Sequence, residues 1–366
     1  MKVVIINAHI EDSLGGSEMQ CDLIAQGLTS KGHDVIYASV GKFRLASYPM
    51  VKYKVLPLNL DCKNEVALFL EHELPDIIYW RYNRKQLKHV VMAKELLRIP
   101  MVFAVSSVHD SMPISLKGYS KGYGLKGFMK QLARIYRSYL SLNLIKKVDG
   151  ISVLNSQLLH KLPNKKQITI WNAATLEMEH FEWERPYVIW VANIKQIKRP
   201  EKYIELASRM AQSSLDLDFL MVGDIHESIP YEVMIQDAKK LPNFHFLGKQ
   251  SPELVNGILK SAICLVHTCE PEGFGNNFIQ AWLQGCPTIT LDHDPDGLIQ
   301  RNDLGFVSRT IEQMASDVLD IFLNKELQKF KGDKARNFAK QHFTPEALTI
   351  RVESFLKEVI NSKVHN

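Results

Sequence analysis

Residues 270–282 read Glu-Pro-Glu-Gly-Phe-Gly-Asn-Asn-Phe-Ile-Gln-Ala-Trp, and no other segment of the chain is as informative about its fold. It lies between two apolar, strand-like runs at residues 263–268 and 287–291. Its second half has the apolar spacing of a helix, which Gly285 ends. The predicted order is therefore strand, glycine turn, helix, strand. This order places the backbone N–H groups of residues 273–276 at a helix N-terminus, where an anion is favoured.

The same alternation of strand and helix occurs in two separate series along the chain. The first series has buried-strand patterns at residues 3–6, 35–40, 76–80 and 101–105, with a glycine loop at Gly15-Gly16 before the first helix. The second series starts near Tyr187 and leads into the segment quoted above. Continuous apolar strands that alternate with helices predict doubly wound parallel sheets. A last amphipathic helix is expected at about residues 345–360.

Length and composition indicate a globular enzyme with about two domains. The chain has 366 residues, of which 46% are hydrophobic and 23% are charged. Its five cysteines form no C-x-x-C pair, so buried reduced thiols are expected. The N-terminal apolar run is too short for a signal peptide, and no stretch approaches 18 apolar residues. We therefore expect a cytoplasmic protein.

The positive charge is concentrated in one segment. Residues 111–148 contain eight basic side chains and no acidic ones, whereas the whole chain has a net charge of +5. Five aromatic residues are interleaved with these cations. We expect residues 117–147 to form an amphipathic surface segment that touches anionic lipid. The alternative is a solvated helix that packs through its Leu and Tyr face; nucleic acid is not expected. The cations are Lys117, Lys121, Lys126, Lys130, Arg134, Arg137, Lys146 and Lys147.

Several segments together resemble the retaining GT-B glycosyltransferases of glycosyltransferase family 4. The signature of that family has a Glu, the sequence Gly-Phe-Gly, and a second Glu eight residues after the first; this chain has Glu272 and Gly273-Phe-Gly275 in place. The resemblance extends to residues 15–35, 105–110, 170–172, 193–200 and 294–306. It implies a GT-B fold, in which two Rossmann-like domains face a cleft. The N-terminal acceptor domain would comprise residues 1–170 and the returning last helix (about 345–362), and the nucleotide-sugar donor domain residues 171–344.

The resemblance also implies site residues. Lys198 would neutralise the diphosphate as it leaves, Glu272 would hold donor-sugar hydroxyls, and His109 would lie near the reacting sugar. The other implied donor-binding residues are Gly15, Gly16, Asn193, Gly273, Phe274, Gly275, Asn276 and Gln280.

Two positions depart from the family pattern. Asn193 stands where the family often has an arginine, so either Lys198 acts alone or Lys195 or Arg199 contributes a second charge. Gln280 replaces the second Glu, which in the family accepts hydrogen bonds from both ribose hydroxyls. A glutamine has one acceptor oxygen, so Gln280→Glu is expected from the sequence to tighten nucleotide binding by up to about tenfold.

A metal-dependent alternative comes from two overlapping D-x-D patterns, formed by Asp292, Asp294 and Asp296. Carboxylates at this spacing hold Mg²⁺ or Mn²⁺ in GT-A glycosyltransferases. The two α/β series favour GT-B instead, where Lys198 and helix N-termini replace the metal. We therefore expect no metal and no cofactor.

The resulting hypothesis is a retaining, metal-independent glycosyltransferase that uses a nucleotide-diphosphate sugar. Its acceptor would be a cell-surface glycan or a lipid-linked precursor, such as lipopolysaccharide or capsule, at the inner face of the cytoplasmic membrane. Two alternatives stay open. A sugar-nucleotide 2-epimerase shares the two-domain plan, and an inactive nucleotide- or glycan-binding subunit would fit Gln280 and Asn193.

Overall fold

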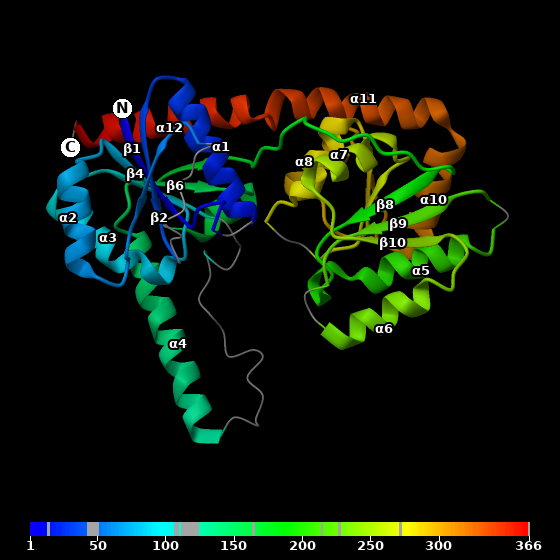
Figure 1. Ribbon diagram of the computed structural model, residues 1–366, viewed down its shortest axis with the longest axis horizontal. Helices are drawn as coiled ribbons and strands as arrows, with labels where there is room; N and C mark the ends of the chain where they lie inside the picture. The colour runs from blue at the N-terminus through cyan, green and yellow to red at the C-terminus, as the bar shows by residue number, and fades with distance from the viewer. Residues whose placement is uncertain are drawn as a thin grey trace. The chain divides into compact units, whose positions relative to one another are not determined.

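The computed structural model describes residues 1–12, 15–41, 51–105, 110, 124–162, 165–213, 215–225, 228–270 and 273–364 (Figure 1). Its internal contacts divide the chain into two compact units. Unit 1 comprises Met1–Asn172 together with Pro345–Asn366, and unit 2 comprises Ala173–Thr344.

Unit 1 contains a seven-stranded sheet in which all pairings are parallel, in the order β3-β2-β1-β4-β5-β6-β7. Its strands are β1 (Lys2–Asn7), β2 (Asp34–Ser39), β3 (Lys54–Pro57), β4 (Ile77–Trp80), β5 (Met101–Ala104), β6 (Gly150–Val153) and β7 (Lys166–Thr169). Its helices are α1 (Gly16–Ser30), α2 (Lys63–Glu73), η1 (Arg84–Gln86), α3 (Leu87–Leu96), α4 (Gly124–Ile145), η4 (Ser156–Lys161) and α12 (Pro345–Val364).

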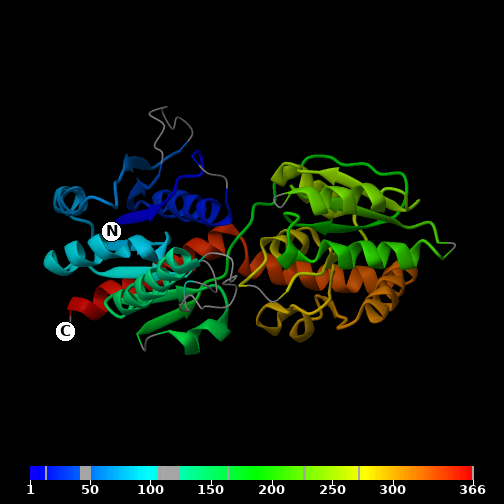
Figure 2. The ribbon, with the colours of Figure 1, turned by 90° about the horizontal axis from the view of Figure 1, so that it is seen from below.

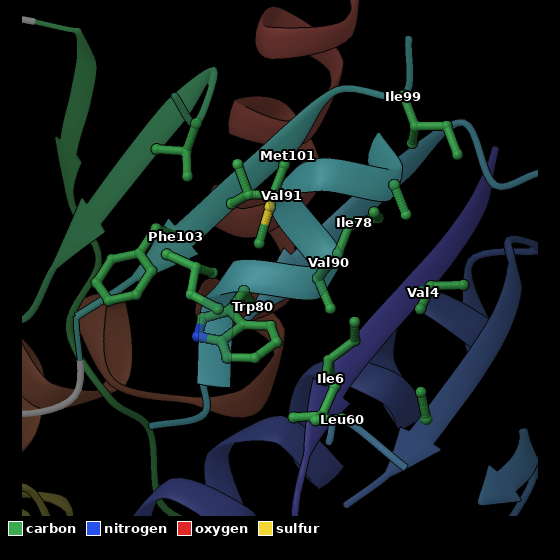
Figure 3. Close-up of a cluster of buried hydrophobic side chains, with 14 of the residues drawn as sticks. Val4, Ile6, Leu60, Ile78, Trp80, Val90, Val91, Ile99, Met101 and Phe103 are labelled. Atoms are coloured by element: carbon green, nitrogen blue, oxygen red, sulfur yellow. The ribbon is translucent and has the colours of Figure 1, made fainter. Parts of the chain in front are cut away.

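The central strands of unit 1 are apolar throughout because helices cover both faces of the sheet. On one face, Ile78 and Trp80 of β4 pack with Val90 and Val91 of α3, and all four side chains are buried (Figure 3). On the other face, Gly150 of β6 lies directly under α12. A Cβ at this glycine would lie 2.7 Å from Val359 Cγ2 of that helix. The last helix, α12, therefore completes the core of unit 1, which also contains the first strand, β1.

Unit 2 contains a six-stranded sheet, again with only parallel pairings, in the order β10-β9-β8-β11-β12-β13. Its strands are β8 (Tyr187–Val191), β9 (Asp218–Val222), β10 (Phe244–Gly248), β11 (Leu265–His267), β12 (Thr288–Thr290) and β13 (Gly305–Val307). Its helices are η5 (Gln196–Lys198), α5 (Pro200–Met210), α6 (Ser228–Ala238), α7 (Pro252–Ser261), α8 (Asn276–Gln284), η6 (Pro295–Gly297), α9 (Leu298–Arg301), α10 (Ile311–Leu323) and α11 (Lys325–His342).

The helix α8 is fixed in unit 2 by aromatic packing. It lies against α11 (Figure 2), and Trp282 of α8 is within 5.7 Å of Phe343, measured between ring centroids. Gly285 ends α8 in the left-handed region at φ 73°, which favours glycine. The strand, glycine turn, helix and strand predicted from residues 263–291 are thus present as β11, α8 and β12. The predicted α/β class with parallel sheets is confirmed.

Within the described ranges, no helix has both the length and the apolar character needed to cross a bilayer.

The contact between α1 and α12 depends on a glycine, and this predicts the effect of a substitution. A Cβ at Gly27 would overlap Thr349 Oγ1 and would lie 2.9 Å from Thr349 Cβ, so rotating the threonine side chain cannot relieve the clash. Overpacking costs about 1–3 kcal/mol, which exceeds the gain of up to about 1 kcal/mol from replacing a helical glycine by alanine. Gly27→Ala is therefore expected to lower the thermal unfolding midpoint by several degrees.

The matched control is Gly273→Ala, because a Cβ at Gly273 meets no described atom within 4 Å. Its melting temperature should stay close to that of the wild type. A Gly27→Ala variant that is more stable than the wild type would contradict the packing argument.

Candidate functional site

Several of the predicted donor residues lie at one edge of the unit 2 sheet. Strands β8 and β11 are neighbours and run parallel, so the loops that follow them meet at their carboxyl ends. The loop after β8 carries Asn193 and Lys198, and the loop after β11 carries residues 273–276. This edge is where open α/β sheets bind ligands.

The N-terminus of α8 is anchored to the end of β8. Asn277 Nδ2 donates a hydrogen bond to the Val191 carbonyl oxygen at 2.9 Å. Gly275 is the N-cap and has no side chain, so no side-chain hydrogen bond caps the helix at this position. The arrangement suits an anion at the positive end of the helix dipole.

The phenylalanine of the Gly-Phe-Gly turn has a structural side chain. Phe274 is only 7% exposed, and its ring lies 5.5 Å from Phe343 and 6.3 Å from Trp282 between centroids. Only the backbone of Phe274 is therefore suited to contact a ligand. The aromatic ring instead fixes the turn that leads into α8.

A hydrogen-bonded chain positions the loop that carries Lys198. The buried Thr268 hydroxyl accepts a hydrogen bond from Trp190 Nε1 at 3.0 Å. Its single proton is shared between the carbonyl oxygens of Lys198 and Arg199, which lie 2.8 and 3.0 Å from the hydroxyl oxygen. The Glu270 N–H donates to the Ile197 carbonyl oxygen at 3.0 Å. The segment after β11 therefore holds the η5 turn in place. Sequence analysis did not identify Thr268, because no local spacing relates it to Lys198.

The cations near Lys198 differ in ion pairing and in exposure. Arg199 donates from its guanidinium to Asp292 Oδ2 at 2.7 Å, so its charge is already compensated. Asn193 is exposed and Lys195 is partly exposed at the start of the same loop. Of the two candidates for a second phosphate-binding charge, Lys195 is therefore better suited than Arg199.

Two of the three aspartates of the D-x-D patterns have hydrogen-bond partners within the protein, and the third is buried. Asp292 is paired with Arg199, and Asp294 accepts the backbone N–H groups of Ile299 and Gln300 at 2.9 and 3.3 Å, which caps the short helix α9. Burial raises the pKa of Asp294. Asp296 is 8% exposed. Among the residues that the structure describes, no group of three His, Cys, Asp or Glu side chains is placed to hold a metal ion.

Gln280 lies one turn into α8 and is engaged by a residue that sequence analysis missed. Its Nε2 donates to Asn256 Oδ1 of α7 at 3.2 Å. Asn256 is 2% exposed and donates in turn to the carbonyl oxygens of Thr175 and Glu177. The one sequence signal for this residue is an Asn-Gly pair inside an otherwise apolar helical stretch.

In unit 1, the predicted glycines lie at the start of α1. Gly15 is the N-cap in an extended conformation, and Gly16 begins the helix. The carboxylate of Glu18 lies so close to Gly15 that a Cβ there would overlap it. The positive end of α1 thus faces a carboxylate of the protein itself, which favours an uncharged ligand group over a phosphate. His109 and Glu272 lie outside the described residues.

A buried polar chain holds the residues after β1. His9 Nε2 lies 3.0 Å from the Tyr53 hydroxyl, which donates to Asp22 Oδ1 at 2.5 Å. The Glu11 N–H donates to His9 Nδ1 at 3.3 Å, so a neutral His9 with its proton on Nε2 satisfies both of these hydrogen bonds. Burial lowers the pKa of His9, which favours this neutral form. Local patterns in the sequence do not predict this hydrogen-bonded chain, because its members are 13 to 44 residues apart.

Comparison with known proteins gives a family match for most of unit 2. Residues 175–340, which lie in unit 2, match the family model described as "Glycosyl transferases group 1". The chain is 21% identical over 381 aligned residues to N-acetyl-alpha-D-glucosaminyl L-malate synthase of Bacillus anthracis, with 95% of each chain covered.

Solved structures of similar fold cover nearly the whole chain. A glycosyltransferase from Rickettsia africae superposes with a TM-score of 0.77 at 15% identity, over 98% of each chain. The Anabaena protein HepE in complex with UDP-glucose superposes with a TM-score of 0.70 at 15% identity, over 98% of this chain and 100% of that one. Together with the two parallel-sheet units, these matches confirm the GT-B fold, and the family match supports a glycosyltransferase.

The Thr268 hydroxyl predicts a pair of substitutions with different effects. Thr268→Val keeps the shape but leaves the Trp190 N–H and two loop carbonyls without this partner. Each buried polar group left unsatisfied costs about 1–3 kcal/mol. The melting temperature should therefore fall clearly, whereas Thr268→Ser, which keeps the hydroxyl, should stay near the wild type. Equal losses in the two variants would show that packing, and not the hydrogen bonds, matters at this position.

Proposed function

Starting from a glycosyltransferase with the GT-B fold, we propose that the protein is a retaining enzyme of the glycosyltransferase family 4 kind. It transfers a sugar from a nucleotide-diphosphate sugar to a cell-surface glycan or lipid-linked acceptor, such as lipopolysaccharide or capsule. The observation that carries the proposal is the hydrogen-bonded junction of the Lys198 turn with the segment that leads into α8. A cation and a helix N-terminus at the ends of adjacent parallel strands form a site for a diphosphate.

In the proposed reaction, the donor lies in unit 2. Lys198 and the backbone N–H groups of residues 273–276 hold the diphosphate, and Asn193 lies beside it. Glu272 holds hydroxyls of the transferred sugar, and Gln280 binds the ribose. A nucleotide-diphosphate sugar is the ligand of one structural neighbour, HepE, which supports a donor of this class.

The chemistry needs no enzyme nucleophile. The bond between the anomeric carbon and the phosphate oxygen breaks through a transition state with oxocarbenium character. The acceptor oxygen attacks on the same face, and its proton passes to an oxygen of the leaving diphosphate. Lys198 stabilises the charge that develops on that diphosphate, in place of a metal ion. In unit 1, Gly15, Gly16 and His109 position the sugar and the acceptor.

The acceptor is proposed to reach the enzyme at an anionic membrane surface, through α4. Six large apolar or aromatic side chains of this helix are 39–65% exposed. At about 100° per residue they share one stripe roughly 120° wide. They are Phe128, Met129, Leu132, Tyr136, Tyr139 and Leu140.

The opposite side of α4 packs against unit 1. Ser138, Ser141 and Ile145 are buried there, and Ser138 accepts a hydrogen bond from Arg84 at 2.6 Å. The Leu and Tyr face is thus exposed instead of packed, which argues against the alternative of a solvated helix held by that face. In Figure 1, α4 extends away from the other described elements of unit 1. By the same spacing, the exposed cations Lys130, Arg134 and Arg137 lie about 180–240° from Phe128, on the side of α4 away from the apolar stripe. Apolar side chains on one side of a helix and cations on the other are typical of a helix that rests on anionic lipid. This arrangement supports contact with a membrane surface, and the proposed location is the cytoplasmic side.

The donor site is tested by nucleotide binding to a pair of lysine variants. Lys198→Ala should weaken the binding of nucleoside diphosphates by roughly 10- to 100-fold, because a charge-assisted contact contributes about 1.5–3 kcal/mol. Lys195→Ala, on the same loop, should have a smaller effect. UDP, GDP and their sugars are first screened by thermal stabilisation, and affinities are then measured by calorimetry.

Transfer to acceptor is then assayed with excess EDTA, in which activity should persist. Activity that is lost in EDTA and restored by Mn²⁺ would move the chemistry to Asp292, Asp294 and Asp296. Conversion of a nucleotide sugar without acceptor would favour the 2-epimerase. A protein that binds no nucleotide would favour the inactive subunit, to which Gln280 and Asn193 point.

Membrane binding is tested by reversing charges on α4. Each cation near an anionic surface contributes about 1 kcal/mol, so Lys130→Glu, Arg134→Glu and Arg137→Glu together should reduce binding to phosphatidylserine vesicles by at least about 100-fold. The matched control reverses three exposed lysines of α11: Lys329, Lys334 and Lys340. Vesicle sedimentation that responds equally to both triple variants, or not at all, would overturn the α4 assignment.

A further inference from the structure

The hydrogen bond between Gln280 and Asn256 joins a predicted ligand-binding residue to a buried side chain of another helix. Gln280 is partly exposed on α8, and its Nε2 donates to Asn256 Oδ1 at 3.2 Å. Asn256 is 2% exposed on α7. A buried amide at this place has to satisfy its donors and its acceptor within the protein.

The orientation of the Asn256 amide is dictated by two backbone carbonyls. Asn256 Nδ2 donates to the oxygens of Thr175 and Glu177, at 3.3 and 2.6 Å. Both partners only accept, so the NH₂ group must face them and Oδ1 must face Gln280. The amide cannot turn over without placing its oxygen against two other oxygens.

The two carbonyls belong to a segment that is itself held against α7. The Glu179 N–H donates to the Glu253 carbonyl oxygen at 2.9 Å. The segment approaches α7 so closely that a Cβ at Gly257 would overlap the Glu179 carbonyl oxygen. Residues 175–179 therefore present fixed carbonyl oxygens to Asn256. These oxygens set the orientation of the Asn256 amide, and the Asn256 amide in turn sets the orientation of the Gln280 amide on α8.

We propose that Asn256 is a positioning residue, which holds the Gln280 amide with its NH₂ group toward α7 and its Oε1 toward the nucleotide. This inference rests on the proposed function, in which Gln280 binds the ribose. An amide held in this way offers the ligand a single acceptor oxygen. The site then selects a ligand group that donates a hydrogen bond, such as one ribose hydroxyl, over a group that only accepts.

The proposal reverses the expectation from the sequence for Gln280→Glu. A carboxylate at position 280 has no proton for Asn256 Oδ1, and two acceptor oxygens would face each other at the present hydrogen-bond distance. The introduced side chain would have to leave this position, and its contact with the nucleotide would be lost. As long as Thr175 and Glu177 hold the Asn256 amide in this orientation, the side chain at position 280 must donate a hydrogen bond to Asn256 Oδ1.

The first test needs no ligand. Melting temperatures are measured for Asn256→Ala, Gln280→Ala and the double variant. If the side chains are bonded, the two losses should be less than additive. Asn256→Ser replaces Asn256→Ala if the alanine variant does not fold, since its hydroxyl still donates to a backbone carbonyl. The matched control is Gln313→Ala on α10, which removes a glutamine that donates to Asp317 Oδ1 at 2.9 Å. Its loss should add fully to that of Asn256→Ala. Additive losses for positions 256 and 280 would overturn the proposal.

The second test measures the affinity of UDP and GDP. Gln280→Glu should weaken binding about tenfold in the presence of Asn256, and it should leave binding unchanged or tighten it in the Asn256→Ala background. The effect of Gln280→Glu on nucleotide affinity should thus depend on whether Asn256 is present. Simple charge repulsion would instead weaken binding in both backgrounds. Removal of a ribose hydroxyl from the probe should matter less in Asn256→Ala than in the wild type. Tightening by Gln280→Glu in the presence of Asn256 would overturn the proposal. If the stability losses are non-additive but neither nucleotide binds, the hydrogen bond stands, and the proposed function and the positioning role both fail.

Discussion

Parallel pairing of buried strands is the constraint on which the other features of this protein depend. Every strand pairing described in either sheet is parallel, so every loop that follows a strand emerges at the same edge. The central strands are mostly apolar, so the polar residues predicted to bind the diphosphate lie on the loops and at the helix N-terminus at that edge. Lys198, the Gly-Phe-Gly turn and the aspartates after β12 are neighbours for this reason, although almost one hundred residues separate the first from the last.

Within that edge, hydrogen bonds determine which charges remain available. Arg199 and Asp292 compensate each other, and Asp294 is occupied by the backbone of α9. The Thr268 hydroxyl uses one donor and its acceptor capacity to hold the backbone of Lys198 without engaging the ammonium group. At the start of α8, the side chains of Phe274 and Trp282 pack against each other, so only the backbone of this turn is suited to contact a ligand.

Much of the fold could be predicted from the sequence, because it follows from local patterns. Apolar runs bounded by glycine predicted β11, α8 and β12, and the apolar spacing in residues 345–360 predicted the helix that is observed as Pro345–Val364. The pairing of Asn256 with Gln280 could not be predicted in this way. It depends on how α7 and α8 pack and on carbonyls some eighty residues earlier in the chain. The same holds for Thr268 and for the His9–Tyr53–Asp22 chain, which arise only when distant segments meet. The roles of Glu272 and His109 stay predictions.

The return of α12 to unit 1 has a consequence for how the chain is made. Unit 1 is built from two segments that are separated by the whole of unit 2. On the ribosome, β1 and α1 emerge early, but the helix that buries Leu348, Val352 and Phe355 against them is synthesised only after unit 2. During that interval the apolar surface that receives α12 is exposed to solvent and to chaperones, while unit 2 has all of its own residues and can fold first. The nascent first half of the chain is therefore the stage most prone to aggregation, and slow translation through unit 2 would prolong it.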